Sequence, residues 1–110
     1  MAIIESNTVK AQKGKGEITI KHLLTPAELD GKCLMFAQVT IPPGAAIGVH
    51  QHTGTTETYH ILQGEALYND NGAEKTIGVG TTTFCPDGEV HGIENVGSED
   101  LIFMALIIKK

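Results

Sequence analysis

The chain has 110 residues, of which 41% are hydrophobic and 19% are charged, and this balance predicts one folded domain over residues 1–110 rather than a disordered chain. The formal net charge of −5 and the lack of a basic cluster argue against nucleic-acid binding, which requires a positive surface. No apolar run is long enough to span a bilayer, and residues 1–21 contain no apolar signal segment. We therefore expect a cytoplasmic protein with neither a nucleic-acid partner nor a membrane partner.

Short segments rich in β-branched and aromatic residues, separated by glycine, proline and asparagine, predict a chain built mainly from strands. In chain order, the expected strands are residues 17–24, 32–41, 48–52, 57–63, 65–69, 73–77, 80–85, 91–95 and 101–108. Many short strands at regular spacing predict an all-β sandwich or barrel, with at most one helical turn near the N-terminus.

Two local signals mark the turns of this fold. Thr25 and Glu28 have the spacing of a capping box around one helical turn that starts with a proline, and Gly31 is expected to end that turn. Asn71 and Gly72 both tolerate a positive φ, so this pair predicts a tight hairpin between two strands.

The expected final strand, residues 101–108, is apolar at both odd and even positions. A half-exposed strand alternates apolar and polar residues, so this pattern predicts burial on both faces or a cover provided by a second subunit. We expect a homodimer, because closed two-fold pairs are the commonest oligomers. The alternative is that the strand at residues 17–24 covers the second face within one chain.

Two further features of the composition limit the chemistry. The chain contains no arginine, the side chain that most often holds carboxylates and phosphates in a bidentate grip, so an anionic ligand must be held by lysine, backbone amides or a metal. Its two cysteines, Cys33 and Cys85, lie far apart and form no CxxC pair. We predict two unpaired, reduced thiols; a metal-ligand or redox role for Cys85 is the alternative.

A cluster of metal-ligating residue types follows the second expected strand. His50 and His52 are two residues apart, so on a strand both imidazoles point to the same face. Glu57 opens the next strand and a hairpin brings it back beside them, while His91 comes from a later strand. Three imidazoles and one carboxylate are a ligand set for Fe, Mn, Zn, Ni or Cu.

The chain resembles the cupin superfamily in two motifs that together run from Gly44 to Asn95. The first, G-x5-H-x-H-x4-E-x6-G, is matched at every spacing by Gly44, His50, His52, Glu57 and Gly64. The second, G-x5-P-x-G-x2-H-x3-N, is matched by Gly80, Pro86, Gly88, His91 and Asn95. The resemblance implies a double-stranded antiparallel β-barrel of the jelly-roll type, and it implies His50, His52, Glu57 and His91 as ligands of one divalent transition metal. It also agrees with the expected homodimer.

Residues between and beside these motifs are placed by strand parity. Tyr59 shares a face with Glu57 and is expected to point into the barrel, either as packing or as a hydrogen-bond donor near the metal. His60 is expected on the opposite face, in a structural or interface role, and His22 lies outside both motifs. Asn95 is expected to bond to a turn, and an apolar pocket lined partly by Tyr59 is expected around the metal.

We expect the metal site to bind a small-molecule ligand or substrate, and two hypotheses about its function follow. The first is a metal-dependent enzyme acting on a small oxygen-rich molecule as a dioxygenase, isomerase, decarboxylase or lyase. The second is a non-catalytic module that binds or senses a small ligand or the metal itself. The complete ligand set favours the enzyme, whereas the missing arginines argue against a sugar-phosphate isomerase. Fold similarity alone does not choose the reaction.

Overall fold

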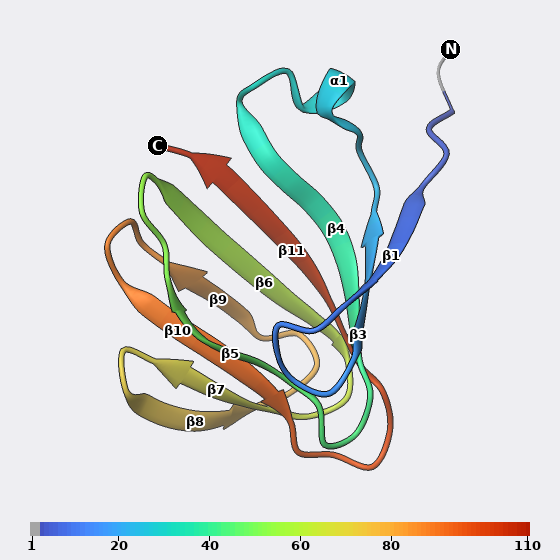
Figure 1. The fold of residues 1–110 in the computed structure, drawn as a ribbon. Coiled ribbons are helices and arrows are strands. Elements are labelled where there is room, and N and C mark those ends of the chain that lie inside the picture. Colours follow the sequence, from blue (N-terminus) through green and yellow to red (C-terminus); the bar gives the residue numbers. More distant parts are fainter. Residues whose placement is uncertain (1–2) are drawn as a thin grey trace.

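A computed structural model describes residues 3–110 of the protein (Figure 1). The strands are β1 (Asn7–Ala11), β2 (Gly14–Lys15), β3 (Ile18–His22), β4 (Cys33–Ile41), β5 (Ala46–Gln51), β6 (Thr55–Gln63), β7 (Ala66–Asp70), β8 (Ala73–Ile77), β9 (Thr82–Cys85), β10 (Val90–Asn95) and β11 (Leu101–Lys109), and the helical turn is α1 (Pro26–Leu29). Over the described residues, no helix combines the length and the apolar composition that crossing a membrane requires.

The strands form two antiparallel sheets. The six-stranded sheet has the order β1-β3-β4-β11-β6-β9, and the five-stranded sheet has the order β2-β5-β10-β7-β8 (Figure 1). The hydrophobic core combines residues of both sheets, including Phe103 and Val39 from the larger and Ile93 and Ala66 from the smaller. The predicted all-β jelly-roll architecture is therefore confirmed, although the sheets are not joined into one closed barrel by the strand pairs of residues 3–110.

Each of the nine expected strands is present, with its boundaries within two residues of those predicted. Two strands were missed, β1 and β2. The residues of β1 are almost all exposed and show no apolar alternation, and β2 is only the pair Gly14–Lys15. Both lie at the edge of a sheet, where pairing of the backbone rather than burial of side chains defines the strand.

Both predicted turns are present. At α1, the carboxylate of Glu28 accepts hydrogen bonds from the backbone N–H of Thr25 at 2.8 Å and from its hydroxyl at 2.7 Å. The helix ends one residue earlier than expected, because Asp30, with φ 53°, is the left-handed cap and Gly31 follows it. Asn71 and Gly72 have φ 52° and 93°, as the predicted hairpin turn requires.

Strand β11 lies in the middle of the larger sheet, between β4 and β6. Leu101, Phe103 and Ala105 are buried in the core, while alternate residues such as Met104 and Leu106 are only partly buried on the outer face. Within one chain, β11 is therefore fully buried on its inner face but not on its outer face, where the prediction of burial is not met. The alternative cover is wrong, because β3 pairs with β4 in the same sheet instead of crossing over β11.

Asn95, at the end of β10, ties two loops to the core. Its side chain is buried and donates hydrogen bonds to the carbonyls of Ile41 and Glu99, both at 2.8 Å, and it accepts one from the N–H of Gly97 at 2.9 Å. These bonds satisfy the whole amide group, and they confirm the predicted structural role of Asn95.

Candidate metal centre

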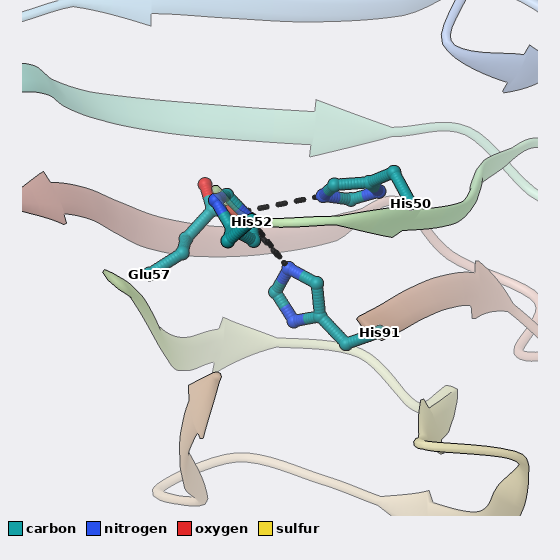
Figure 2. Close-up of side chains that lie close together, drawn as sticks. All are labelled: His50, His52, Glu57 and His91. Atoms are coloured by element: carbon teal, nitrogen blue, oxygen red, sulfur yellow. Dashed lines mark hydrogen bonds and ion pairs between the residues drawn. The ribbon is translucent and has the colours of Figure 1, made fainter. Parts of the chain in front are cut away.

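The four predicted ligand residues come from both sheets and meet between them. His50 lies on β5 and His52 directly follows it, His91 lies on β10, and Glu57 lies on β6 of the other sheet. His91 is the direct cross-strand partner of His50. All four side chains point toward one another (Figure 2). The structure therefore brings together every residue of the predicted set.

One carboxylate oxygen lies at the centre of this cluster. Glu57 Oε1 is 2.9 Å from His52 Nε2, 3.0 Å from His91 Nε2 and 3.6 Å from His50 Nε2. The Nε2 atoms of His52 and His91 are 3.1 Å apart, and one candidate ligand atom from each of the four residues lies within 4.8 Å of the others. Ligand atoms that converge so closely form a site of the size that a single metal ion requires.

The outward-facing nitrogen of each histidine has a hydrogen-bond partner, and for His50 that partner fixes the tautomer. The Nδ1–H of His50 donates to the carbonyl of Gly48 at 2.8 Å, because a carbonyl can only accept. The hydroxyls of Thr55 and Tyr68 lie 2.9 Å and 2.8 Å from the Nδ1 atoms of His52 and His91 and can accept in the same way. A bound metal ion would replace the Nε2 protons that hydrogen bonds to Glu57 require, and with Nδ1 protonated each Nε2 would then offer a lone pair to the ion. The donor set thus fits a divalent transition metal.

The charge distribution of the cluster favours a bound cation. Burial alone raises the pKa of Glu57, but hydrogen bonds with His50 and His91 outweigh it and lower this pKa to about 2. The carboxylate is therefore ionised at neutral pH although its side chain is only 5% exposed. Burial also lowers the pKa of His52, which keeps its ring neutral. A buried carboxylate anion is stabilised when a cation joins it.

Tyr59 is inside the fold, as strand parity predicted, and it is 1% exposed. Its ring stacks on the ring of His91, with centroids 4.9 Å apart and an interplanar angle of 18°. Burial raises the pKa of Tyr59 well above its ordinary value, and the nearby Glu57 carboxylate raises it further. The hydroxyl therefore stays protonated, and the ring holds the plane of His91.

Tyr68 is the functional residue that the sequence analysis missed. Its hydroxyl is the partner of His91 Nδ1, and it reaches that position because β7 pairs with β10. Burial raises the pKa of Tyr68 to about 12, so its hydroxyl also stays protonated. The expected strand at residues 65–69 includes Tyr68 but does not give its neighbouring strand, and no local pattern encodes that pairing.

The remaining histidines and cysteines lie outside the cluster. His60 is exposed on the outer face, with its Nδ1 2.8 Å from the hydroxyl of Thr82, so it points away from the cluster as predicted. Cys33 and Cys85 form no disulfide, which confirms the prediction of unpaired thiols. Cys85 is buried but does not belong to the group of candidate ligands among the described residues.

A cavity of about 800 Å³ opens beside His50, His52 and Glu57. Its wall is mainly apolar and includes Tyr59, as predicted. Most of the other lining residues come from the larger sheet, among them Ile18, Ile20, Val39 and Ile107. His22, which no motif included, also lines this cavity. The volume falls in the range of small-molecule sites, which is roughly 300 to 1,000 Å³.

Tyr68→Phe tests whether the hydrogen bond between Tyr68 and His91 raises the metal affinity of the candidate site. We expect metal affinity to fall about 10- to 100-fold, because His91 loses the group that orients its ring. Competition against a chromophoric chelator measures this loss. Thr82→Val is the matched control, since it removes the hydroxyl that contacts His60 on the outer face. Equal metal affinity of the Tyr68→Phe and wild-type proteins would contradict the role of Tyr68.

Two antiparallel sheets packed around an inward-facing cluster of three histidines and one glutamate define a jelly-roll protein with a candidate metal site. Residues 37–107 match the family described as Cupin domain. Because this match covers more than half of the chain, the chain belongs to the cupin family.

Three relatives place the chain within this family. It is 44% identical over 95 residues to an oxalate-binding protein of Thermotoga maritima, covering 86% of this chain and 78% of the relative. It matches the crystal structure of a predicted oxalate decarboxylase of the same organism with a TM-score of 0.89 and 40% identity, over 97% of this chain and 94% of that one. It is 30% identical over 80 residues to an oxalate decarboxylase of Bacillus subtilis, covering 68% of this chain but 21% of the enzyme.

Proposed function

We propose that the chain binds one divalent transition metal, of the group Fe, Mn, Zn, Ni and Cu, through His50, His52, Glu57 and His91, and that the metal-loaded site binds oxalate. The observation that carries the proposal is the convergence of three Nε2 atoms and one ionised carboxylate beside a cavity. When bound, the metal supplies a Lewis acid with a net charge of about +1, because Glu57 is the only charged ligand. A small dicarboxylate matches that charge.

The relatives and the composition support oxalate as the ligand. The relative with 44% identity is an oxalate-binding protein, and both decarboxylase matches concern the same dianion. The chain has no arginine to hold a carboxylate, so the metal takes the part that arginine has in many anion sites. Oxalate can offer two oxygens to a metal that four protein side chains leave partly open.

Binding without catalysis is favoured by the residues around the cavity. Decarboxylation of oxalate replaces one carboxylate by a proton and therefore needs a proton donor. Among the described lining residues, Glu57 is the one carboxyl group, and its pKa of about 2 keeps it ionised. Tyr59 has a pKa raised well above its ordinary value by burial, which makes it a poor acid. Among the described lining residues, no carboxylic acid is left to donate the proton, and this favours the binding hypothesis over the enzyme that the ligand set alone favoured. Lys13 and His22 are the lining residues that could donate a proton in a decarboxylase. The second candidate function, oxalate decarboxylation, is supported by the match to the Bacillus subtilis enzyme.

Calorimetric titration of oxalate into the protein loaded with each of the five metals tests the proposal. We expect one oxalate per chain for at least one metal and no binding after treatment with a chelator. Acetate serves as the control ligand, because a monoanion offers one carboxylate and should bind more weakly. Absence of oxalate binding with all five metals would overturn the proposal. Formate production from oxalate, followed by NMR, would favour the decarboxylase instead.

We also propose that two copies of the chain pair through the outer face of the larger sheet. We call the apolar residues there the outer apolar face, defined by Leu34, Phe36, Leu62, Phe84, Ile102, Met104 and Leu106. Leu34, Leu62 and Phe84 are 55%, 44% and 56% exposed, and β4, β6, β9 and β11 place no Asp or Glu on this face. A neutral apolar face can pack against its own copy without repulsion between like charges.

A further inference from the structure

One positive side chain stands at the cavity beside the candidate metal centre. Lys13 lies in the loop between β1 and β2 and lines the cavity together with His50, His52 and Glu57. Among the described lining residues it is the one lysine, in a chain that has no arginine. The side chain is exposed to solvent.

The backbone of Lys13 is attached to the segment that holds His50. The N–H of Gly48 donates to the Lys13 carbonyl at 2.8 Å, and the carbonyl of the same Gly48 accepts the Nδ1–H of His50. The next residue, Gly14, pairs with Ile47 of β5. One short segment of β5 thus fixes both a candidate metal ligand and the position from which the lysine side chain extends.

Gly14 permits this close approach. A Cβ atom at this position would lie 2.4 Å from the backbone nitrogen of Gly48 and 3.0 Å from the carbonyl oxygen of Ala46, both of which are backbone atoms that cannot move aside. Any other residue would push the loop away from β5. The contact that brings Lys13 to the cavity therefore depends on a glycine.

The neighbouring lysines have other partners. Lys15 forms an ion pair with Glu94 at 3.7 Å, and the ammonium of Lys10 donates to the hydroxyl of Thr19 at 2.8 Å. Within residues 3–110, no hydrogen bond or ion pair engages the ammonium group of Lys13.

We propose that Lys13 selects dianionic ligands by pairing with the carboxylate oxygens that the metal does not hold. The inference rests on the proposed function and adds a charge balance to it. A divalent metal, the Glu57 carboxylate and oxalate sum to −1, and the Lys13 ammonium brings the sum to zero. Beside a mainly apolar wall, a neutral set of charges costs far less to desolvate than a charged one. A neutral ligand gains nothing from Lys13.

Lys13→Gln and Lys15→Gln form a matched pair of variants to test the inference. Oxalate and imidazole are titrated separately into each metal-loaded protein. We expect Lys13→Gln to weaken oxalate binding about tenfold or more, as the loss of a charge-assisted hydrogen bond would. Imidazole, a neutral metal ligand, should bind equally to all three proteins. Lys15→Gln should bind oxalate like the wild type, because its ammonium pairs with Glu94 instead.

The outcomes separate this inference from the proposed function. If the wild type binds oxalate and Lys13→Gln binds it within twofold, the role of Lys13 is overturned and the proposed function stands. If Lys13→Gln weakens oxalate and imidazole equally, the variant has damaged the metal site, and selection by charge is again overturned. If the wild type binds no oxalate with any of the five metals, both proposals fall.

Discussion

A protein carrying His50→Ala together with His52→Ala should retain no divalent transition metal after dialysis, whereas the wild type should retain one ion per chain. The double change removes two of four candidate ligands and leaves His91 and Glu57, which cannot enclose an ion alone. Elemental analysis of protein dialysed against trace metal measures the stoichiometry. This is the largest effect on the site that we expect from any substitution, because no other described side chain replaces the lost imidazoles.

The matched control is the double change His22→Ala and His60→Ala. It removes the same number of imidazoles from the same chain, but neither residue belongs to the cluster of candidate ligands. This control should keep full stoichiometry and so excludes nonspecific binding to the histidines outside the cluster. Full metal retention by the His50→Ala and His52→Ala protein would show that the ligand assignment is wrong.

Of the candidate ligands, the pair His50 and His52 was predictable from local geometry. The alternation of a strand places His50 and His52 on one face. The predicted hairpin that would bring Glu57 beside them is wrong, because β5 and β6 lie in different sheets and Glu57 faces the pair from the opposite sheet. The position of His91 depends on its pairing with His50 across two distant strands. Parity alone does not give that contact, and only the motif spacing of the family resemblance indicated it.

What the sequence did not reveal depends on contacts between distant segments. Tyr68 supports His91 only because β7 lies beside β10. Lys13 reaches the cavity only because a two-residue strand, β2, pairs with β5, and so short an exposed strand has no side-chain pattern. Tyr59 and His60 were placed correctly because inward and outward positions alternate within one strand. Strand faces are thus encoded locally, whereas strand neighbours are not.

The second large effect is expected on the outer apolar face. Wild-type protein at micromolar concentration should sediment as a dimer of the 11.7 kDa chain, and the double variant Met104→Asp and Leu106→Asp should sediment as a monomer. Both residues lie near the centre of this face, on β11. In a two-fold pair each new carboxylate is buried close to its own symmetry copies, which costs several kcal/mol through desolvation and repulsion.

Two features of the structure keep this experiment specific to the outer face. Met104 and Leu106 alternate with the buried Phe103 and Ala105, so the substitutions leave the inner face, and with it the metal stoichiometry, unchanged. Val79→Asp, at an apolar residue that is 70% exposed in the loop before β9, is the matched control and should remain dimeric. A monomeric wild type would rule out the pairing. β3 lies within the sheet rather than over it, so a monomeric wild type would also mean that the outer apolar face stays uncovered in solution. The Met104→Asp and Leu106→Asp variant would then differ from the wild type in solubility but not in sedimenting mass.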